Sequence, residues 1–200
     1  MIFPPYLLLS ALVVGGNAHS VITQVLGANG VDGQGFGVIP GTPRDGSTPG
    51  VYEQDSSIIR NNEINTGKAG PCGRTPAGGN NDVASQMDAA VEAGLPSASA
   101  DGVVSMILHQ VNQDGAGPYS CDISTDGSGS EFVSMEVTQN VPGFASLSLA
   151  AAQDFPLDAQ LPAGTNCTGG PDGNACLIRC RNSAIAGPFG GCVAVKLGNS

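Results

Sequence analysis

Short segments with alternating apolar and polar residues recur along most of this chain, and turn-forming residues bound each of them. Alternation with a period of two places every second side chain on the same face, which is typical of a half-buried β-strand. The pattern predicts strands at residues 21–26, 103–111, 131–139, 175–181 and 192–197. Within residues 131–139 it directs the side chains of Val133, Met135 and Val137 toward a core.

Two other segments carry signals for the start of a short helix. The run Asp55-Ser56-Ser57 offers an N-cap before Ile58 and Ile59, and Asn81-Asp82 can cap a helix over residues 83–93. In the second segment three apolar side chains share one helical face, those of Val83, Met87 and Val91.

Glycine and proline are so frequent in residues 27–50 that we expect a long ordered loop there. Loops of this length usually serve a function or bridge other elements. No internal repeat or linker divides the chain. The whole pattern predicts an all-β protein, an immunoglobulin-like β-sandwich with long, disulfide-pinned loops and short helices.

An apolar run at residues 3–14 is followed by small residues up to Ala18. This order predicts a signal peptide at residues 1–18, and the run is too short to span a bilayer comfortably. We therefore expect one secreted domain at residues 19–200, extracellular or associated with the cell wall. Cleavage after Ala18 would make His19 the first residue of the mature protein.

The chain is acidic, with 17 Asp and Glu against 7 Lys and Arg and a net charge of -10. An acidic surface repels phosphate backbones, so we expect no nucleic-acid partner. After removal of the leader we also expect no membrane partner, and a monomer.

All six cysteines follow the predicted leader: Cys72, Cys121, Cys167, Cys176, Cys180 and Cys192. An even number in a secreted chain favours three disulfides over a zinc site, and the sequence leaves their pairing open. Cys176 and Cys180 cannot bond to each other across a straight strand, because that spacing separates them by roughly 13 Å. Beside Cys167, a glycosylation sequon begins at Asn166.

The candidate chemistry lies in the two histidines, His19 and His109. His109 ends the best predicted strand, where a side chain is held by the sheet and opens to the surface. If the N-terminal strand lies beside it, the His19 amine and the two imidazoles supply three nitrogens to one ion. Three nitrogens in a plane suit Cu(II), which also leads the affinity order for such ligands. The alternatives without a metal ion are that His109 is a packed, hydrogen-bonded strand residue and that His19 belongs to a frayed N-terminus.

Several longer motifs lie at residues 71–75, 108–112, 114–121, 180–182 and 187–192. They resemble those of the fungal Egh-like secreted proteins, which include the Gas and Mas appressorium virulence factors. The resemblance covers nearly all of the chain after the leader. It implies a secreted fungal protein linked to host penetration, without a settled biochemical activity.

A looser similarity is to lytic polysaccharide monooxygenases, which are secreted β-sandwich copper enzymes whose mature chains begin with histidine. It implies that His19 and His109 form a copper-binding brace and that Phe189 fills the axial position. The chain departs from that pattern at Gly187, where those enzymes commonly have Gln or Glu. Possible substitutes are Gln110, Glu136 and Arg181.

Other catalytic motifs are weak in this sequence. There is no nucleophile elbow, and no carboxylate pair suited to glycoside hydrolysis stands out. The acids Asp122, Asp126 and Glu131 lack the spacing of a helix-loop-helix calcium site. The sequence therefore predicts a copper-dependent enzyme that oxidatively cleaves cell-wall polysaccharide, and the alternative is a non-catalytic copper-binding or wall-associated effector. The absence of Trp, with Tyr52 and Tyr119 the only tyrosines after the leader, weighs against flat binding to crystalline polysaccharide.

Overall fold

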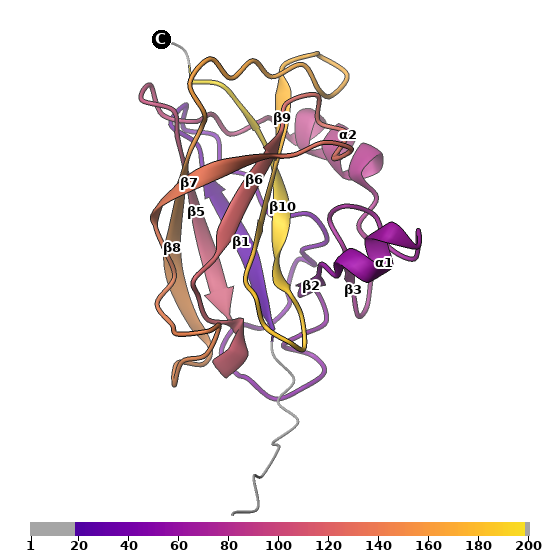
Figure 1. Ribbon diagram of the computed structural model, residues 1–200, viewed down its shortest axis with the longest axis vertical. Helices are drawn as coiled ribbons and strands as arrows, with labels where there is room; N and C mark the ends of the chain where they lie inside the picture. The colour runs from indigo at the N-terminus through magenta and orange to yellow at the C-terminus, as the bar shows by residue number, and fades with distance from the viewer. Residues whose placement is uncertain (1–18, 199–200) are drawn as a thin grey trace, which may run out of the picture.

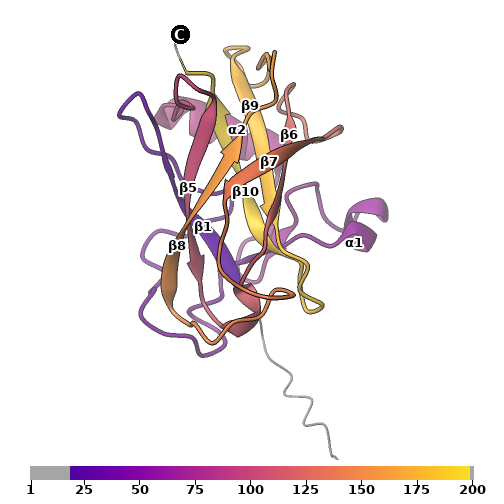
Figure 2. The same ribbon diagram turned by 60° about the vertical axis from the view of Figure 1, so that its left-hand side comes forward.

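Seven strands close into a barrel around one apolar core. The computed structural model describes residues 19–198, so the predicted leader lies outside the described residues. Around the barrel the order is β1-β5-β8-β7-β6-β9-β10, and β10 returns to β1 (Figures 1 and 2). The strands are β1 (Ser20–Leu26), β5 (Val103–Gln110), β6 (Ser120–Ser124), β7 (Val133–Gln139), β8 (Gln153–Gln160), β9 (Ala175–Arg181) and β10 (Phe189–Lys196).

The closure between the first and the last strand decides the architecture. Val21 pairs with Gly190 in parallel orientation, whereas the other barrel neighbours are antiparallel. The long loop continues the seam, because Gly35 N donates to Ile22 O (3.1 Å) and Phe36 N donates to Cys192 O (2.8 Å). The all-β prediction is confirmed, but the immunoglobulin-like sandwich is wrong. Alternation tells which face of a strand is buried and does not tell whether the edge strands meet.

Inward-facing side chains of every barrel strand form the main core. They include Ile22, Leu108, Ile123, Met135, Leu157, Ile178 and Val193. On β7, Met135 is buried and Val137 packs against the core as expected. Val133 is 58% exposed, although Ile123 opposite it on β6 is buried, so the prediction fails at the first residue of that strand.

A second apolar cluster lies outside the barrel under helix α2 (Val83–Ala93), which Figure 1 shows beside β9 and β10. This helix begins as predicted, because the Asp82 side chain accepts a hydrogen bond from Ser85 N (2.9 Å). Its buried residue Met87 packs in the cluster that includes Cys192 and Leu177.

The predicted helix start at Asp55 is wrong. The Asp55 carboxylate is buried and accepts two hydrogen bonds from Arg44, at 3.0 and 2.6 Å. With its carboxylate so engaged, Asp55 caps no helix, and the chain continues into the short strand β2 (Ser57–Ile58), which pairs with β10. Two further short strands, β3 (Arg74–Thr75) and β4 (Gly79–Asn80), and a helix of one turn, α1 (Asn61–Asn65), complete this lateral extension.

The six cysteines form three disulfides. Cys72 bonds to Cys192, Cys121 to Cys180 and Cys167 to Cys176. The first joins the lateral extension to β10, the second joins β6 to β9, and the third closes a short loop onto β9. Asn166 is exposed beside the third disulfide, and its glycosylation stays a prediction.

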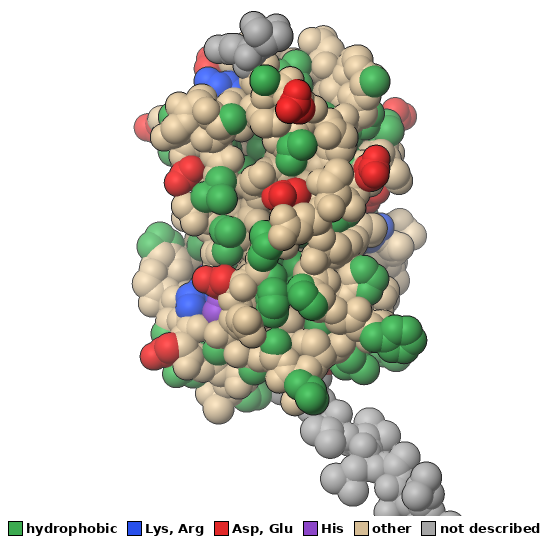
Figure 3. All heavy atoms as spheres, turned by 90° about the vertical axis from the view of Figure 1, so that its left-hand side faces the viewer, with side chains coloured by type: hydrophobic (Ala, Val, Ile, Leu, Met, Phe, Trp, Pro, Cys, Tyr) green, Lys and Arg blue, Asp and Glu red, His purple; other side chains and the backbone are tan. Residues whose placement is uncertain are grey.

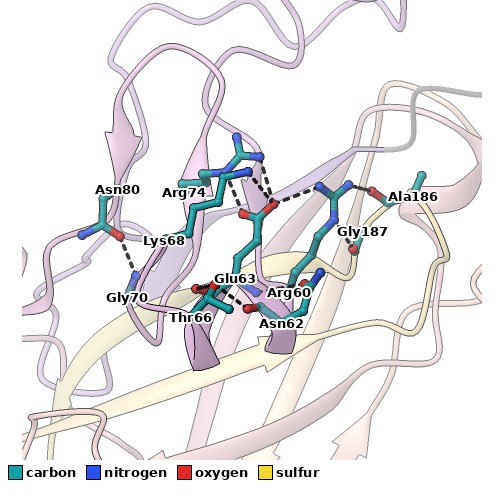
Figure 4. Close-up of polar contacts among 10 residues, drawn as sticks. All are labelled: Arg60, Asn62, Glu63, Thr66, Lys68, Gly70, Arg74, Asn80, Ala186 and Gly187. Carbon is teal, nitrogen blue, oxygen red and sulfur yellow. Dashed lines mark hydrogen bonds and ion pairs between the residues drawn. The ribbon is translucent and has the colours of Figure 1, made fainter.

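Glu63 on α1 collects three cationic side chains around one buried carboxylate (Figure 4). Arg74 Nε donates to it at 2.7 Å and Arg60 Nη1 at 3.2 Å, and Lys68 Nζ lies 3.8 Å away. Arg60 also donates to the main-chain oxygens of Ala186 and Gly187, so this cluster holds the segment that precedes β10. The hydrogen bonds from Arg74, followed in importance by those from Arg60, lower the pKa of Glu63 to about 2.

Replacing this carboxylate is expected to change how stability depends on pH. A pKa lowered in the folded state stabilises the protein above the unfolded-state value near 4.5, and that stability is lost as pH falls toward about 2. We expect Glu63→Gln to lower the free energy of unfolding by about 1–3 kcal/mol at pH 7 and by little at pH 2. Urea unfolding at several pH values measures this, with Glu92→Gln on the exposed side of α2 as the control. If the free energy of unfolding falls equally for Glu63→Gln and for the unmodified protein between pH 5 and 2, the Glu63 carboxylate does not contribute this pH-dependent stability.

Candidate functional site

The two histidines lie at one end of the barrel and on the same outer face, His19 directly before β1 and His109 on the neighbouring strand β5. His109 pairs directly with Val21, and His19 stands two residues before Val21. The ladder extends one step further, because Val111 N donates to His19 O (3.0 Å). In an antiparallel pair this register makes the two histidines diagonal neighbours, with their side chains on one face. Ile22 and Leu108, which alternate with them, point into the core.

His109 is oriented by an acidic side chain on the next strand. Asp154 stands directly opposite it on β8, and His109 Nδ1 lies 2.6 Å from Asp154 Oδ1. The side chain of His109 is 3% exposed and that of Asp154 is 66% exposed. His109 Nε2 is buried and has no hydrogen-bond partner among the residues that the structure describes. When Nδ1 donates its proton to the carboxylate, Nε2 keeps a lone pair, which is the arrangement of a histidine that ligates a metal ion.

His19 belongs to a polar network with Glu53 and Asn112. Its main-chain nitrogen donates to Asn112 Oδ1 (2.6 Å), and its Nδ1 lies 3.1 Å from Glu53 Oε1. Asn112 Nδ2 donates to the same Glu53 oxygen (2.8 Å), which closes the network. Burial raises the pKa of Glu53, and the hydrogen bond from Asn112 opposes that rise. The two nitrogens of His19 that could chelate an ion therefore face one buried carboxyl and one amide.

Phe189 packs directly against the ring of His19. The ring centroids are 4.9 Å apart with an angle of 43° between the planes, and Phe189 is 1% exposed. Its main-chain nitrogen donates to Asn182 Oδ1 (3.0 Å), and its ring clusters with Ala184 and Ile58. The position expected for an axial residue is thus occupied by a side chain in contact with His19, and its role at a metal ion stays a prediction.

Gly187 stands where the monooxygenases commonly have Gln or Glu, and the sequence offers three possible substitutes. Two of them have other hydrogen-bond partners, and the third is exposed on another strand. The amide of Gln110 donates to Ser148 Oγ (2.8 Å) and Ala150 O (2.7 Å). Arg181 donates to Asn61 Oδ1 (2.6 Å), and Glu136 is exposed on β7.

Within residues 19–198 there is no cluster of three or more His, Cys, Asp or Glu side chains that could hold a metal ion. A third strong donor beside the two imidazoles would have to come from the main chain, at the amine that cleavage would create on His19. The sequence interpretation missed Glu53, Asn112 and Asp154. For Asp154 a signal existed, since β8 alternates apolar residues at positions 155, 157 and 159.

Comparison with known proteins places this barrel in a fungal family. The model of the Egh16-like virulence factor family matches residues 17–190. The chain belongs to this family. Its relatives include appressoria-specific virulence factor GAS1 of Pyricularia oryzae (strain 70-15 / ATCC MYA-4617 / FGSC 8958), 43% identical over 199 residues, which cover 96% of this chain and 76% of the relative.

A second relative from the same strain is appressoria-specific virulence factor GAS2. It is 36% identical over 239 residues, covering 88% of this chain and 82% of the relative. No solved structure matches the chain significantly. Among the described residues, no helix has the length and apolar character needed to cross a membrane.

Proposed function

We propose that this Egh16-like protein is a secreted virulence factor that binds a copper ion through His19 and His109 and acts at the cell wall. Secretion is supported by the leader pattern, by the three disulfides and by the names of relatives that are specific to appressoria. Disulfides persist in oxidising compartments outside the cytosol.

The single observation that carries the copper proposal is the buried Nε2 of His109, which lacks a partner in the described structure while Asp154 engages Nδ1. A buried polar atom without a partner is unfavourable unless a ligand satisfies it. The donor set also fits, because His19 brings an imidazole on the same face and, after cleavage, an amine. Nitrogen donors of this kind favour Cu(II) over the other divalent first-row metals.

Oxidative cleavage of a wall polysaccharide is the second candidate function. A copper ion supplies one-electron redox chemistry when a reductant and peroxide or oxygen are present. In that role Asp154 would orient His109, and Phe189 would exclude water from one side of His19. The burial of His19 (7% exposed) and His109 (2% exposed) favours binding over attack on a solid substrate, because the reacting bond must reach the site.

The two candidates are separated by one incubation. Copper-loaded mature protein is mixed with reductant, peroxide and a set of wall glycans, and soluble products are analysed by mass spectrometry. Tight copper uptake without products supports a binding protein, whereas oxidised oligosaccharides establish the enzyme. Copper affinity no higher than that of a denatured control contradicts both.

The carboxylate behind His109 is expected to tune the affinity for copper. Removing the negative charge with Asp154→Asn should weaken Cu(II) binding by about 10–100-fold, the usual effect of losing a group that orients a ligating histidine. Calorimetric titration measures this, with Asp158→Asn on the same strand as the matched control. Equal affinities for the two variants would show that Asp154 does not act on the site.

A further inference from the structure

Two loops at the same end of the barrel as the histidines expose large apolar side chains. Residues 140–152 connect β7 to β8, and residues 182–188 connect β9 to β10 (Figure 2). Four side chains extend from them, which we call the apolar tips: Phe144 (86% exposed), Leu147 (57%), Leu149 (95%) and Ile185 (102%). Aliphatic side chains with this exposure lose hydrophobic stabilisation in water and commonly mark an interaction site when they occur together.

The two loops are joined, so the apolar tips belong to one surface. Ser146 Oγ lies 3.1 Å from Ser183 Oγ and accepts a hydrogen bond from Ser183 N (3.0 Å). Ser146 is fully buried between the loops. The first loop is also fixed to the strand of His109, because the Gln110 side chain donates to Ser148 Oγ and to Ala150 O.

Phe144 and Leu147 flank a tight turn whose main-chain groups form hydrogen bonds within the protein. Ala145 and Ser146 have positive φ values of 51° and 64°, as at the centre of a type I′ turn. On either side, Phe144 N donates to Leu147 O and Leu147 N donates to Phe144 O, both at 3.0 Å. Ser146 N donates to Gly117 O (3.0 Å). Main chain with internally satisfied hydrogen bonds can enter an apolar phase, where no water replaces a missing partner.

Neither loop contains a charged residue. No Asp, Glu, Lys or Arg occurs at residues 140–153 or 182–195, in a chain with a net charge of -10. In Figure 3 the lower right of the visible face carries hydrophobic side chains without acidic or basic ones beside them. The loops themselves offer no cation to an anionic headgroup, and the net negative charge of the protein repels one. Arg60 lies against the second loop, but its guanidinium already donates to Ala186 O, Gly187 O and Glu63 Oε1.

From these observations we infer that the apolar tips insert into the surface of an uncharged or zwitterionic lipid layer. The tips protrude separately, so a rigid partner would need a pocket for each, whereas acyl chains move around them. All four are Phe, Leu or Ile, the kinds of side chain whose transfer from water to a hydrocarbon phase is strongly favourable. This inference departs from the expectation of no membrane partner and does not depend on the copper proposal.

Vesicle co-flotation of the full secreted chain tests the inference. The probes are pure phosphatidylcholine vesicles and vesicles with added phosphatidylserine. We expect binding to the first and weaker binding to the second. The triple variant Phe144→Ser/Leu149→Ser/Ile185→Ser should lose about a thousandfold in partitioning, since burial of each side chain contributes about tenfold.

The matched control is Val51→Ser/Val133→Ser, which removes apolar side chains that are 50% and 58% exposed on other parts of the surface. It should bind phosphatidylcholine like the unmodified chain, and copper affinity should stay unchanged in all variants. No binding to phosphatidylcholine, or equal losses in control and triple variant, would overturn the inference. Two other outcomes without vesicle binding would also overturn the inference, provided that the triple variant abolishes them. Self-association would indicate that the apolar tips bind a second copy of the chain, and retention on an insoluble neutral glycan would indicate that they bind a glycan.

Discussion

The variant His109→Ala is expected to bind Cu(II) at least about a hundredfold more weakly than the unmodified mature protein. The substitution removes the buried Nε2 that lacks a partner among the described residues, and it removes the imidazole that Asp154 orients. What remains at the site is His19 alone, whose amine and ring can still hold copper as an N-terminal chelate. The expected result is therefore a large loss of affinity rather than complete loss, measured by competition with a chelator of known affinity.

The matched control for this variant is Ile107→Ala. Ile107 lies two residues earlier on β5, on the same outer face, and carries no donor atom. It should leave copper affinity unchanged while truncating a side chain of similar size. If His109→Ala and Ile107→Ala bind copper equally well, His109 is a structural histidine and the copper proposal is wrong.

Removal of the Cys72–Cys192 disulfide with Cys72→Ser/Cys192→Ser is expected to lower the free energy of unfolding by about 5 kcal/mol. The cysteines are 120 residues apart, so the bond restricts much of the unfolded chain. Both are fully buried in the cluster under α2, and the new hydroxyls would also need partners there.

The comparison variant Cys167→Ser/Cys176→Ser opens a bond between residues only 9 apart and should lower the free energy of unfolding by about 3 kcal/mol. Urea unfolding of both oxidised double variants measures the difference. A larger loss for the Cys167–Cys176 variant than for the Cys72–Cys192 variant would contradict the expectation that the longer crosslinked loop stabilises more.

Alternation predicted five of the seven barrel strands, and a cap at Asn81-Asp82 before a one-sided apolar pattern predicted α2. The prediction missed β6 and β8 (Gln153–Gln160); β8 alternates apolar and polar residues, but Pro156 weighs against a strand interior. Pro156 pairs with Ile107 on β5, whereas the ladder to β7 covers only residues 158–160 of β8. Closure of the barrel was also missed, since β1 and β10 pair at one ladder position, Val21 with Gly190, and no local pattern encodes that pairing.

For the site, the sequence identified the two histidines and the neighbouring strands that carry them. It could not identify Glu53, because that residue lies 34 positions after His19 and meets it only in the folded chain. Asn112 and the pairing of Asp154 with His109 were missed because these contacts also join segments far apart in sequence. The apolar tips escaped notice because nothing local distinguishes a protruding Leu149 from a buried one.

In the proposed site the amine and ring of His19 and the ring of His109 hold one copper ion. Electron paramagnetic resonance can compare Cu(II) bound to secreted protein that begins at His19 with Cu(II) bound to the same chain carrying one extra glycine before His19. We expect a nitrogen hyperfine pattern from three nitrogens in the first sample and a changed pattern with fewer in the second. Identical spectra, or only the signal of loosely held copper in both, would contradict the proposed site.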